Sequence, residues 1–138
     1  MSDAAKSLPH YTYDEWKQWE GRWELIDGIP YAMSPLPVLK HQIIASKLTA
    51  EFIMQFKKCN GCLAIQPVDY KIAEDTVLQP DMVVVCGEVM TKKYLDFPPA
   101  LTLEVLSPST AHKDRHIKYG IYESQGIKYY IIISPDKE

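Results

Sequence analysis

The 138-residue sequence lacks any long hydrophobic run, since no apolar stretch approaches the roughly 20 residues that a membrane-spanning helix needs. Its first residues, Met1 to Lys6, also lack the apolar segment of a secretory signal peptide. We therefore expect a cytoplasmic protein with no membrane partner. Internal repeats and low-complexity tracts are absent too, and the length suits one domain over residues 1–138 that buries its own core.

The sequence also lacks a basic excess. Its 15 Lys and Arg residues stand against 18 Asp and Glu residues, which gives a net charge of -3. This balance argues against a protein that coats nucleic acid indiscriminately. It does not exclude a nuclease, because bound cations offset carboxylates and local basic patches contact phosphates. The candidate patches, each more often a solvated face, are Lys57–Lys58, Lys92–Lys93 and the trio Lys113, Arg115 and Lys118.

Cysteine is scarce, and three cysteines do not make a disulfide framework. Cys59 and Cys62 have the spacing of half a zinc site or of a redox pair, but no second such pair completes four zinc ligands. The Asn-Gly between them is also typical of a turn. Cys86 follows a run of valines and is interpreted as a small buried hydrophobe. A zinc or redox protein that uses Cys59 and Cys62 stays open as an alternative function.

Two short apolar runs, Met82–Cys86 and Ala100–Leu106, read as strands that are buried on both faces. Asp81 precedes the first run and Glu104 lies inside the second. A buried carboxylate without a partner costs several kcal/mol, so both residues need one. A shared divalent cation is a suitable partner, and two carboxylates with water and a phosphate oxygen suit Mg²⁺ or Mn²⁺. A turn-forming Asp and a surface Glu are the simpler interpretation.

The rest of the chain alternates between helical and strand-like patterns. Thr12 is the expected N-cap of a short helix, and Asp27-Gly28 is a strong hairpin signal. The clearest helix has an apolar residue at every fourth position. The predicted helices are Tyr13 to Trp19, Val38 to Lys58 and Ala111 to Ser124, and the predicted strands are Trp23–Ile26, Tyr31–Met33, Leu63–Ile65, Tyr70–Ile72, Val77–Leu78, Met82–Cys86, Ala100–Leu106 and Tyr129–Ile133.

Several segments, in order along nearly the whole chain, resemble the Uma-type restriction endonuclease family of the PD-(D/E)XK nuclease superfamily. Each segment alone is a weak signal, and the ordered set is a strong one. The matching segments are Trp23 to Gly28, His41 to Gln42, Gln79 to Asp81, Glu104 to Thr110, Asp114, Lys118 to Tyr119, Gly126 and Tyr129 to Ile132.

The resemblance implies an α/β (α+β) fold with a restriction endonuclease-like core, in which helices flank a mixed central β-sheet. It implies a metal-dependent endonuclease with DNA as the expected substrate. In such an enzyme Asp81, Glu104 and the Val105 carbonyl would lie close enough together to bind one Mg²⁺ or Mn²⁺ ion. The superfamily lysine, two residues after the glutamate, is replaced here by Leu106. The family pattern moves this role to Lys118, and Glu24 completes the carboxylate set. A catalytically silent domain that retains the fold is the other alternative.

Some residues of the pattern carry simpler interpretations. His41 is as readily a hydrogen-bonded core or cap residue, and Glu24 a solvent-facing strand residue. Asp114 and Lys118 are four residues apart, which favours an ion pair within one helix that contributes ~0.3–0.5 kcal/mol. If Lys118 instead replaces the lysine missing at Leu106, Lys118→Ala should abolish cleavage and leave the fold intact, because the ion pair contributes little.

The apolar strand Tyr129–Ile133 lies close to the end of the sequence. Members of the resembled family usually continue with further strands, which we expect this chain to lack. A free apolar edge invites pairing with another chain, so we expect a homodimer.

Overall fold

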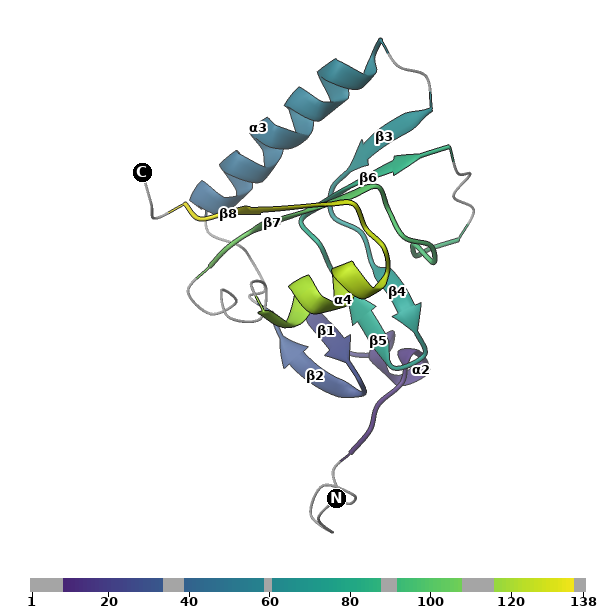
Figure 1. The fold of residues 1–138 in the computed structure, drawn as a ribbon. Helices are drawn as coiled ribbons and strands as arrows, with labels where there is room; N and C mark the ends of the chain where they lie inside the picture. Colours follow the sequence, from purple (N-terminus) through teal and green to yellow (C-terminus); the bar gives the residue numbers. More distant parts are fainter. Residues whose placement is uncertain (1–8, 34–38, 59–60, 88–91, 108–115, 136–138) are drawn as a thin grey trace.

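The computed structural model describes residues 9–33, 39–58, 61–87, 92–107 and 116–135 (Figure 1). Helices and strands follow one another in the predicted order, and the mixed α/β composition is confirmed. The helices are α2 (Tyr13–Trp16), α3 (Leu39–Phe56) and α4 (Lys118–Ser124). The strands are β1 (Trp23–Ile26), β2 (Ile29–Ala32), β3 (Cys62–Ile65), β4 (Tyr70–Ala73), β5 (Thr76–Leu78), β6 (Met82–Cys86), β7 (Leu101–Val105) and β8 (Tyr129–Ile133).

The predicted hairpin is present, with β1 and β2 paired antiparallel around Asp27 and Gly28. These two residues have φ values of 51° and 80°, the left-handed backbone that a two-residue hairpin turn requires. Gly28 also faces the His10 ring so closely that an added Cβ would lie 2.1 Å from it. Only glycine fits this position, which fixes where the hairpin turns.

The strands form two four-stranded sheets rather than one central sheet, in the orders β2-β1-β5-β4 and β3-β6-β7-β8. The second sheet is mixed, because β7 and β8 are parallel. The chain crosses between the sheets at the short segment from β5 to β6, which contains Pro80. Proline has no backbone N–H and cannot continue a ladder, so this segment separates the two sheets.

The sheet of β3, β6, β7 and β8 has one hydrophobic core on each face. Ala45 of α3 packs on Met82, Val84, Leu103 and Val105 on one face. The other face contacts Tyr122 of α4 and the buried residues Tyr70 and Leu78 of the smaller sheet. Figure 1 shows the resulting layers, with α3 on one side of β7 and β8, and α4 and the smaller sheet on the other.

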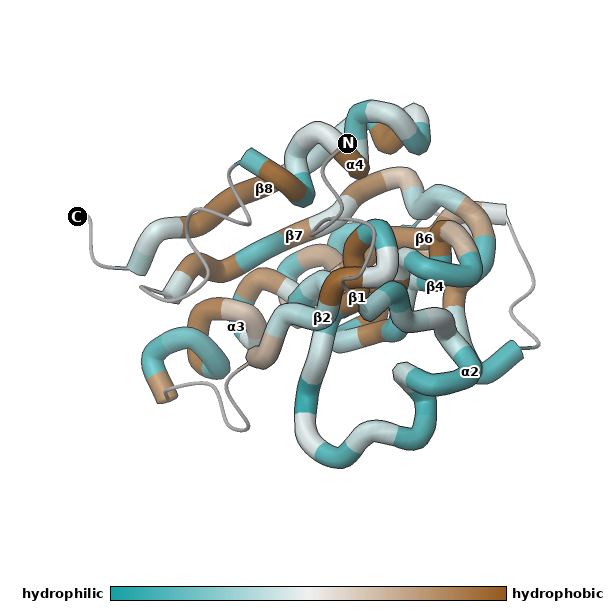
Figure 2. The backbone as a smooth tube through the Cα atoms, turned by 90° about the horizontal axis from the view of Figure 1, so that it is seen from below, coloured by the Kyte–Doolittle hydropathy of each residue, from teal (hydrophilic) through white to brown (hydrophobic). Residues whose placement is uncertain are grey.

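Helix α4 lies in the crossover between the parallel strands β7 and β8, as parallel pairing requires. This connection carries Lys118, the first residue of α4, onto the face opposite α3. Figure 2 shows that β8 is strongly hydrophobic, whereas α2 is hydrophilic. Within the described part of the chain, β8 is the last strand of its sheet.

The first predicted helix is shorter than expected. Thr12 is the N-cap of α2 as predicted, but the helix ends at Trp16 rather than Trp19. The ring N–H of Trp16 donates to the Trp23 carbonyl at 2.8 Å, which holds the end of the helix against β1. The predicted start of the last helix, from Ala111, lies outside the described residues, as do Asp114 and Cys59. No helix among the described residues is long and apolar enough to cross a membrane.

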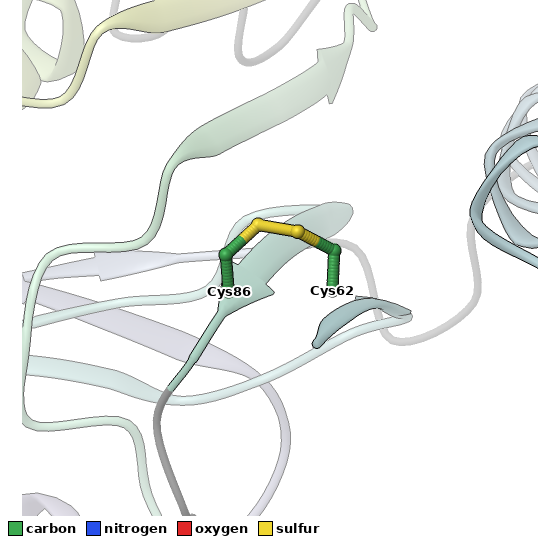
Figure 3. The surroundings of a disulfide bond; sticks show 2 residues. All are labelled: Cys62 and Cys86. Carbon is green, nitrogen blue, oxygen red and sulfur yellow. A yellow bond between two sulfur atoms is a disulfide. The ribbon is translucent and has the colours of Figure 1, made fainter. Parts of the chain in front are cut away.

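The interpretation of the cysteines was wrong. Cys62 and Cys86 face each other across the antiparallel pair of β3 and β6 and form a disulfide (Figure 3). Cys62 is therefore not a partner for Cys59 in a zinc or redox site. Cys86 is exposed rather than buried, because it is the last residue of β6, beyond the buried segment Met82–Val85.

The disulfide predicts the number of free thiols. The oxidised, denatured protein should react with one equivalent of a thiol reagent, because the bond uses two of the three cysteines. After reduction, three equivalents should react. The bond spans 24 residues, so its loss should lower the free energy of unfolding by about 3 kcal/mol if it acts through chain entropy. Three reactive thiols before reduction would show that the bond does not form.

Candidate active site

The backbone of β6 and β7 sets Asp81 beside Glu104. Met82 pairs with Leu103 in the antiparallel register, so the preceding residue, Asp81, lies next to Glu104. The Asp81 N–H donates to the Leu103 carbonyl at 3.1 Å. In return the Val105 N–H donates to Asp81 Oδ2 at 2.6 Å. Asp81 is thereby fixed at the end of the sheet, where a charged side chain meets a cleft instead of the core.

Glu24, Glu104 and Lys118 form a buried charge cluster. They come from β1, β7 and α4, and their side chains are 0%, 3% and 1% exposed. Lys118 Nζ lies 2.8 Å from Glu24 Oε2 and 2.5 Å from Glu104 Oε1. The structure thus brings Lys118 to Glu104 across the β7–α4–β8 crossover. The interpretation of Glu24 as a solvent-facing residue was wrong, because packing of the two sheets covers β1.

Two further groups hold the carboxylates of this cluster in place. The Tyr122 hydroxyl donates to Glu104 Oε1 at 2.8 Å, and the Gln79 backbone N–H donates to Glu24 Oε2 at 2.8 Å. Burial, followed by the charge of Glu104, raises the pKa of Tyr122 well above its ordinary value. Tyr122 therefore remains a neutral hydroxyl donor.

His41 lies against Asp81 from the first turn of α3, with Nε2 at 3.3 Å from Asp81 Oδ2. The hydrogen bond to Asp81 is the largest influence on His41 and raises its pKa above 6.5, although burial opposes the shift. The Val105 backbone also contributes to this rise. His41 is thus part of the site at the end of β7.

The pKa of His41 gives a direct prediction for the metal-free protein. Its NMR titration should lie above 6.5, and it should shift downward in Asp81→Asn, because the anionic partner is lost. A histidine whose folded pKa is raised stabilises the fold fully below its unfolded pKa. This contribution is lost as the pH rises through the folded pKa. An unchanged titration in Asp81→Asn would contradict the pairing.

Asp81 and His41 line a cleft of about 320 Å³, which we call the site cleft. Arg22 and Gln66 are among its other lining residues. Asp81 is 12% exposed, so solvent and small ligands reach it. The positive charge of Arg22 acts on His41 and lowers its pKa slightly, which places Arg22 near the same point.

The donor atoms at this point suit a hard divalent cation. Asp81 and Glu104 offer carboxylate oxygens, and Val105 offers a backbone carbonyl at the end of β7. Among the described residues no group of three or more His, Cys, Asp or Glu side chains is arranged to hold a metal. Proteins bind Mg²⁺ through one or two carboxylates while water and substrate phosphate complete its shell, so Asp81 and Glu104 remain candidate ligands.

The two carboxylates face different neighbours. Asp81 is turned toward His41 on α3, whereas Glu104 is turned toward Lys118 and Tyr122 on α4. A cation at Glu104 would therefore lie close to the positive charge of Lys118. The expectation that one cation is shared stays a prediction.

Several contacts of the site were not predicted from the sequence. Tyr122 is four residues after Lys118 and shares its helix face, so the spacing alone could have suggested it. Gln79 belongs to the recognised Gln-Pro-Asp segment, but it acts through its backbone. Arg22 has no signal of its own, because it reaches the cleft from the segment before β1.

Comparisons with known proteins identify the family and the fold of the chain. Residues 11–138 match the model of the Uma2 family, whose description is putative restriction endonuclease. No curated protein sequence matches the chain. The fold is similar to the crystal structure of a putative nuclease belonging to DUF820 from Anabaena variabilis ATCC 29413, with a TM-score of 0.73 and 19% identity. The match covers 92% of this chain and 81% of that chain, and it confirms the predicted fold class.

Proposed function

Because this chain belongs to the Uma2 family of putative restriction endonucleases, we propose that it is a metal-dependent endonuclease that hydrolyses phosphodiester bonds in DNA. The observation that supports this most is the buried cluster of Glu24, Glu104 and Lys118 next to Asp81. Burying three charges is costly, and removing them in favour of apolar residues is often neutral or stabilising. A buried charge cluster beside an open cleft is better explained by a role in catalysis than by a contribution to the stability of the fold.

Mg²⁺ or Mn²⁺ is the proposed cofactor, held by Asp81, Glu104 and the Val105 carbonyl. When bound, such an ion supplies a Lewis acid for the scissile phosphate and a water of lowered pKa. The hydrogen bond from the Val105 N–H keeps the Asp81 carboxylate at the end of the sheet. His41 holds the same carboxylate from the side of α3.

Lys118 is the proposed catalytic cation. Its Nζ lies between two carboxylates, which fix its position. From there its charge offsets negative charge that develops on the phosphate and orients a water molecule. Glu24 contacts Lys118 rather than Asp81, so we assign it the role of holding Lys118 in place when Glu104 turns to a cation.

A cleavage assay tests the proposal. Purified protein should cut supercoiled plasmid DNA in Mg²⁺ or Mn²⁺, and excess EDTA should stop the reaction. Calorimetry with Mn²⁺ should show a binding site that is lost in Asp81→Asn and in Glu104→Gln. A protein that neither binds Mn²⁺ nor cuts DNA would instead be a catalytically silent domain that retains the fold.

We also propose a homodimer, because β8 is a largely apolar edge strand within the described part of the chain. Exposed edges of this kind pair with other chains, and two related sites suit the cutting of both strands of a duplex. Sedimentation at micromolar concentration should give twice the chain mass of 15.8 kDa. A stable, soluble species of 15.8 kDa alone would refute it.

A further inference from the structure

The site cleft continues into two further clefts that the proposed reaction does not use. Arg22 and Pro67 line both the site cleft and a second cleft of about 300 Å³, the middle cleft. Asp69, Gln79 and Lys93 line both the middle cleft and a third of about 240 Å³, the tryptophan cleft. The three clefts are therefore neighbours that share lining residues between Asp81 and α2, and we call this row of clefts the groove.

The tryptophan cleft collects all three tryptophans of the chain, Trp16, Trp19 and Trp23. The Trp16 ring N–H donates to the Trp23 carbonyl at 2.8 Å, and the Trp23 ring N–H donates to the Glu20 carbonyl at 2.9 Å. These two indoles thus have their only donors satisfied inside the protein. What they present to a ligand is ring surface, which favours stacking over hydrogen bonding.

Tyrosine rings extend this aromatic surface. Tyr13 stacks on Trp16 with ring centroids 5.7 Å apart and planes inclined by 25°. Tyr94, which lines the middle cleft, meets the edge of Tyr13 at 5.2 Å. Lys71 Nζ lies over the Tyr13 ring, 4.4 Å from its centroid, and this cation–π contact also holds the ring in place. The aromatic rings are therefore held in fixed positions before any ligand binds.

The middle and tryptophan clefts have more basic than acidic lining residues, although the protein as a whole has a net charge of -3. Their charged lining residues are four cations and one anion: Arg22, Lys17, Lys92 and Lys93 against Asp69. Lys92 is paired with Asp96 and Lys17 with Asp14. Lys93 is exposed, and no salt bridge to it is found among the described residues. It lies where the middle and tryptophan clefts meet.

We propose that this groove binds an unpaired DNA strand, with its bases stacked on the tryptophan cleft and its backbone on Arg22 and Lys93. The proposal rests on the proposed nuclease function, because the groove leads to Asp81. Aromatic rings next to cations are the chemistry by which proteins bind unpaired bases, whereas paired bases keep their faces hidden in the duplex. The preferred substrate is therefore DNA that contains a single-stranded segment.

The tryptophans report directly on this contact. The Asp81→Asn protein in EDTA is titrated with oligothymidylate, and binding should quench the tryptophan fluorescence to saturation. A hairpin duplex of the same sequence length should bind at least about tenfold more weakly, which corresponds to the loss of roughly one stacked base. An RNA oligomer forms a third arm. Binding without quenching, equal binding of duplex, or tighter binding of RNA would each overturn the proposal.

A pair of charge-reversed variants tests the path of the strand. Lys93→Glu should weaken oligothymidylate binding about tenfold at low salt, whereas Lys47→Glu, an exposed residue of α3 with the same change in charge, should not. Equal effects of the two variants would overturn the path. The cleavage assay separates this inference from its premise: quenching without cleavage in Mn²⁺ contradicts only the proposed function, and cleavage without quenching contradicts only the groove.

Discussion

Replacement of Lys118 with Met is expected to abolish cleavage and to lower the free energy of unfolding by about 3–5 kcal/mol, the usual cost of breaking a buried ion pair from one side. The variant would leave Glu24 and Glu104 buried together without their cation. The sequence alone predicted that the fold would survive the loss of Lys118 almost unchanged. That prediction assumed an exposed lysine. Lys118 is 1% exposed, so that expectation does not apply.

Urea denaturation at pH 8 measures this effect, and two further variants identify its cause. Glu104→Gln keeps one lysine against Glu24 and should destabilise the protein less than Lys118→Met. In the double variant the loss should be smaller than the sum of the two single losses, because both residues belong to one network. Lys47→Met, which removes an exposed lysine of α3, serves as the matched control and should remain within ±0.5 kcal/mol of the wild type.

The pH gives a second readout of the same variant. At low pH the two carboxylates can share a proton, which removes their repulsion in the absence of Lys118. The stability deficit of Lys118→Met should therefore shrink between pH 8 and pH 5. A folded Lys118→Met protein with wild-type stability at pH 8 would show that the ion pairs of Lys118 with Glu24 and Glu104 do not stabilise the fold.

Much of the fold could be predicted because its signals are local. The Asp27-Gly28 turn needs only two residues to specify a hairpin, and the apolar stripe of α3 repeats within a single helix. Asp81 and Glu104 could be singled out for a similar reason. Each is a charge beside or inside a short apolar run, and that conflict is visible without any knowledge of the partners.

What the sequence did not reveal depends on contacts between distant segments. The disulfide follows from the register of β3 against β6, which sets Cys62 opposite Cys86. No local pattern fixes a pairing across 24 residues. Burial of Lys118 likewise depends on the crossover that brings α4 over β7, whereas its spacing from Asp114 suggested only an exposed pair. The groove that reaches the tryptophans is assembled from several elements and has no single motif.

Asp81→Asn should separate catalysis from stability. The variant should cut DNA at least about 1000-fold more slowly, since a metal-assisted step loses several kcal/mol without a carboxylate ligand. The side chain lies at a cleft and is 12% exposed, and the asparagine oxygen can still accept the Val105 N–H. The free energy of unfolding should therefore fall by only about 1–2 kcal/mol. Single-turnover cleavage and urea denaturation of the same preparation measure both quantities.

The chain offers a matched control in Asp75, which also pairs with a histidine. His10 Nε2 lies 3.1 Å from Asp75 Oδ2, at the hairpin turn rather than at the end of β7. Asp75→Asn removes the same charge from the same kind of pair, and it should leave cleavage unchanged. If both variants lost activity equally, the loss would reflect a general effect of charge or folding. If Asp81→Asn cleaved at the wild-type rate with Mn²⁺ bound, Asp81 would not be a ligand, and the metal would have to be held without it.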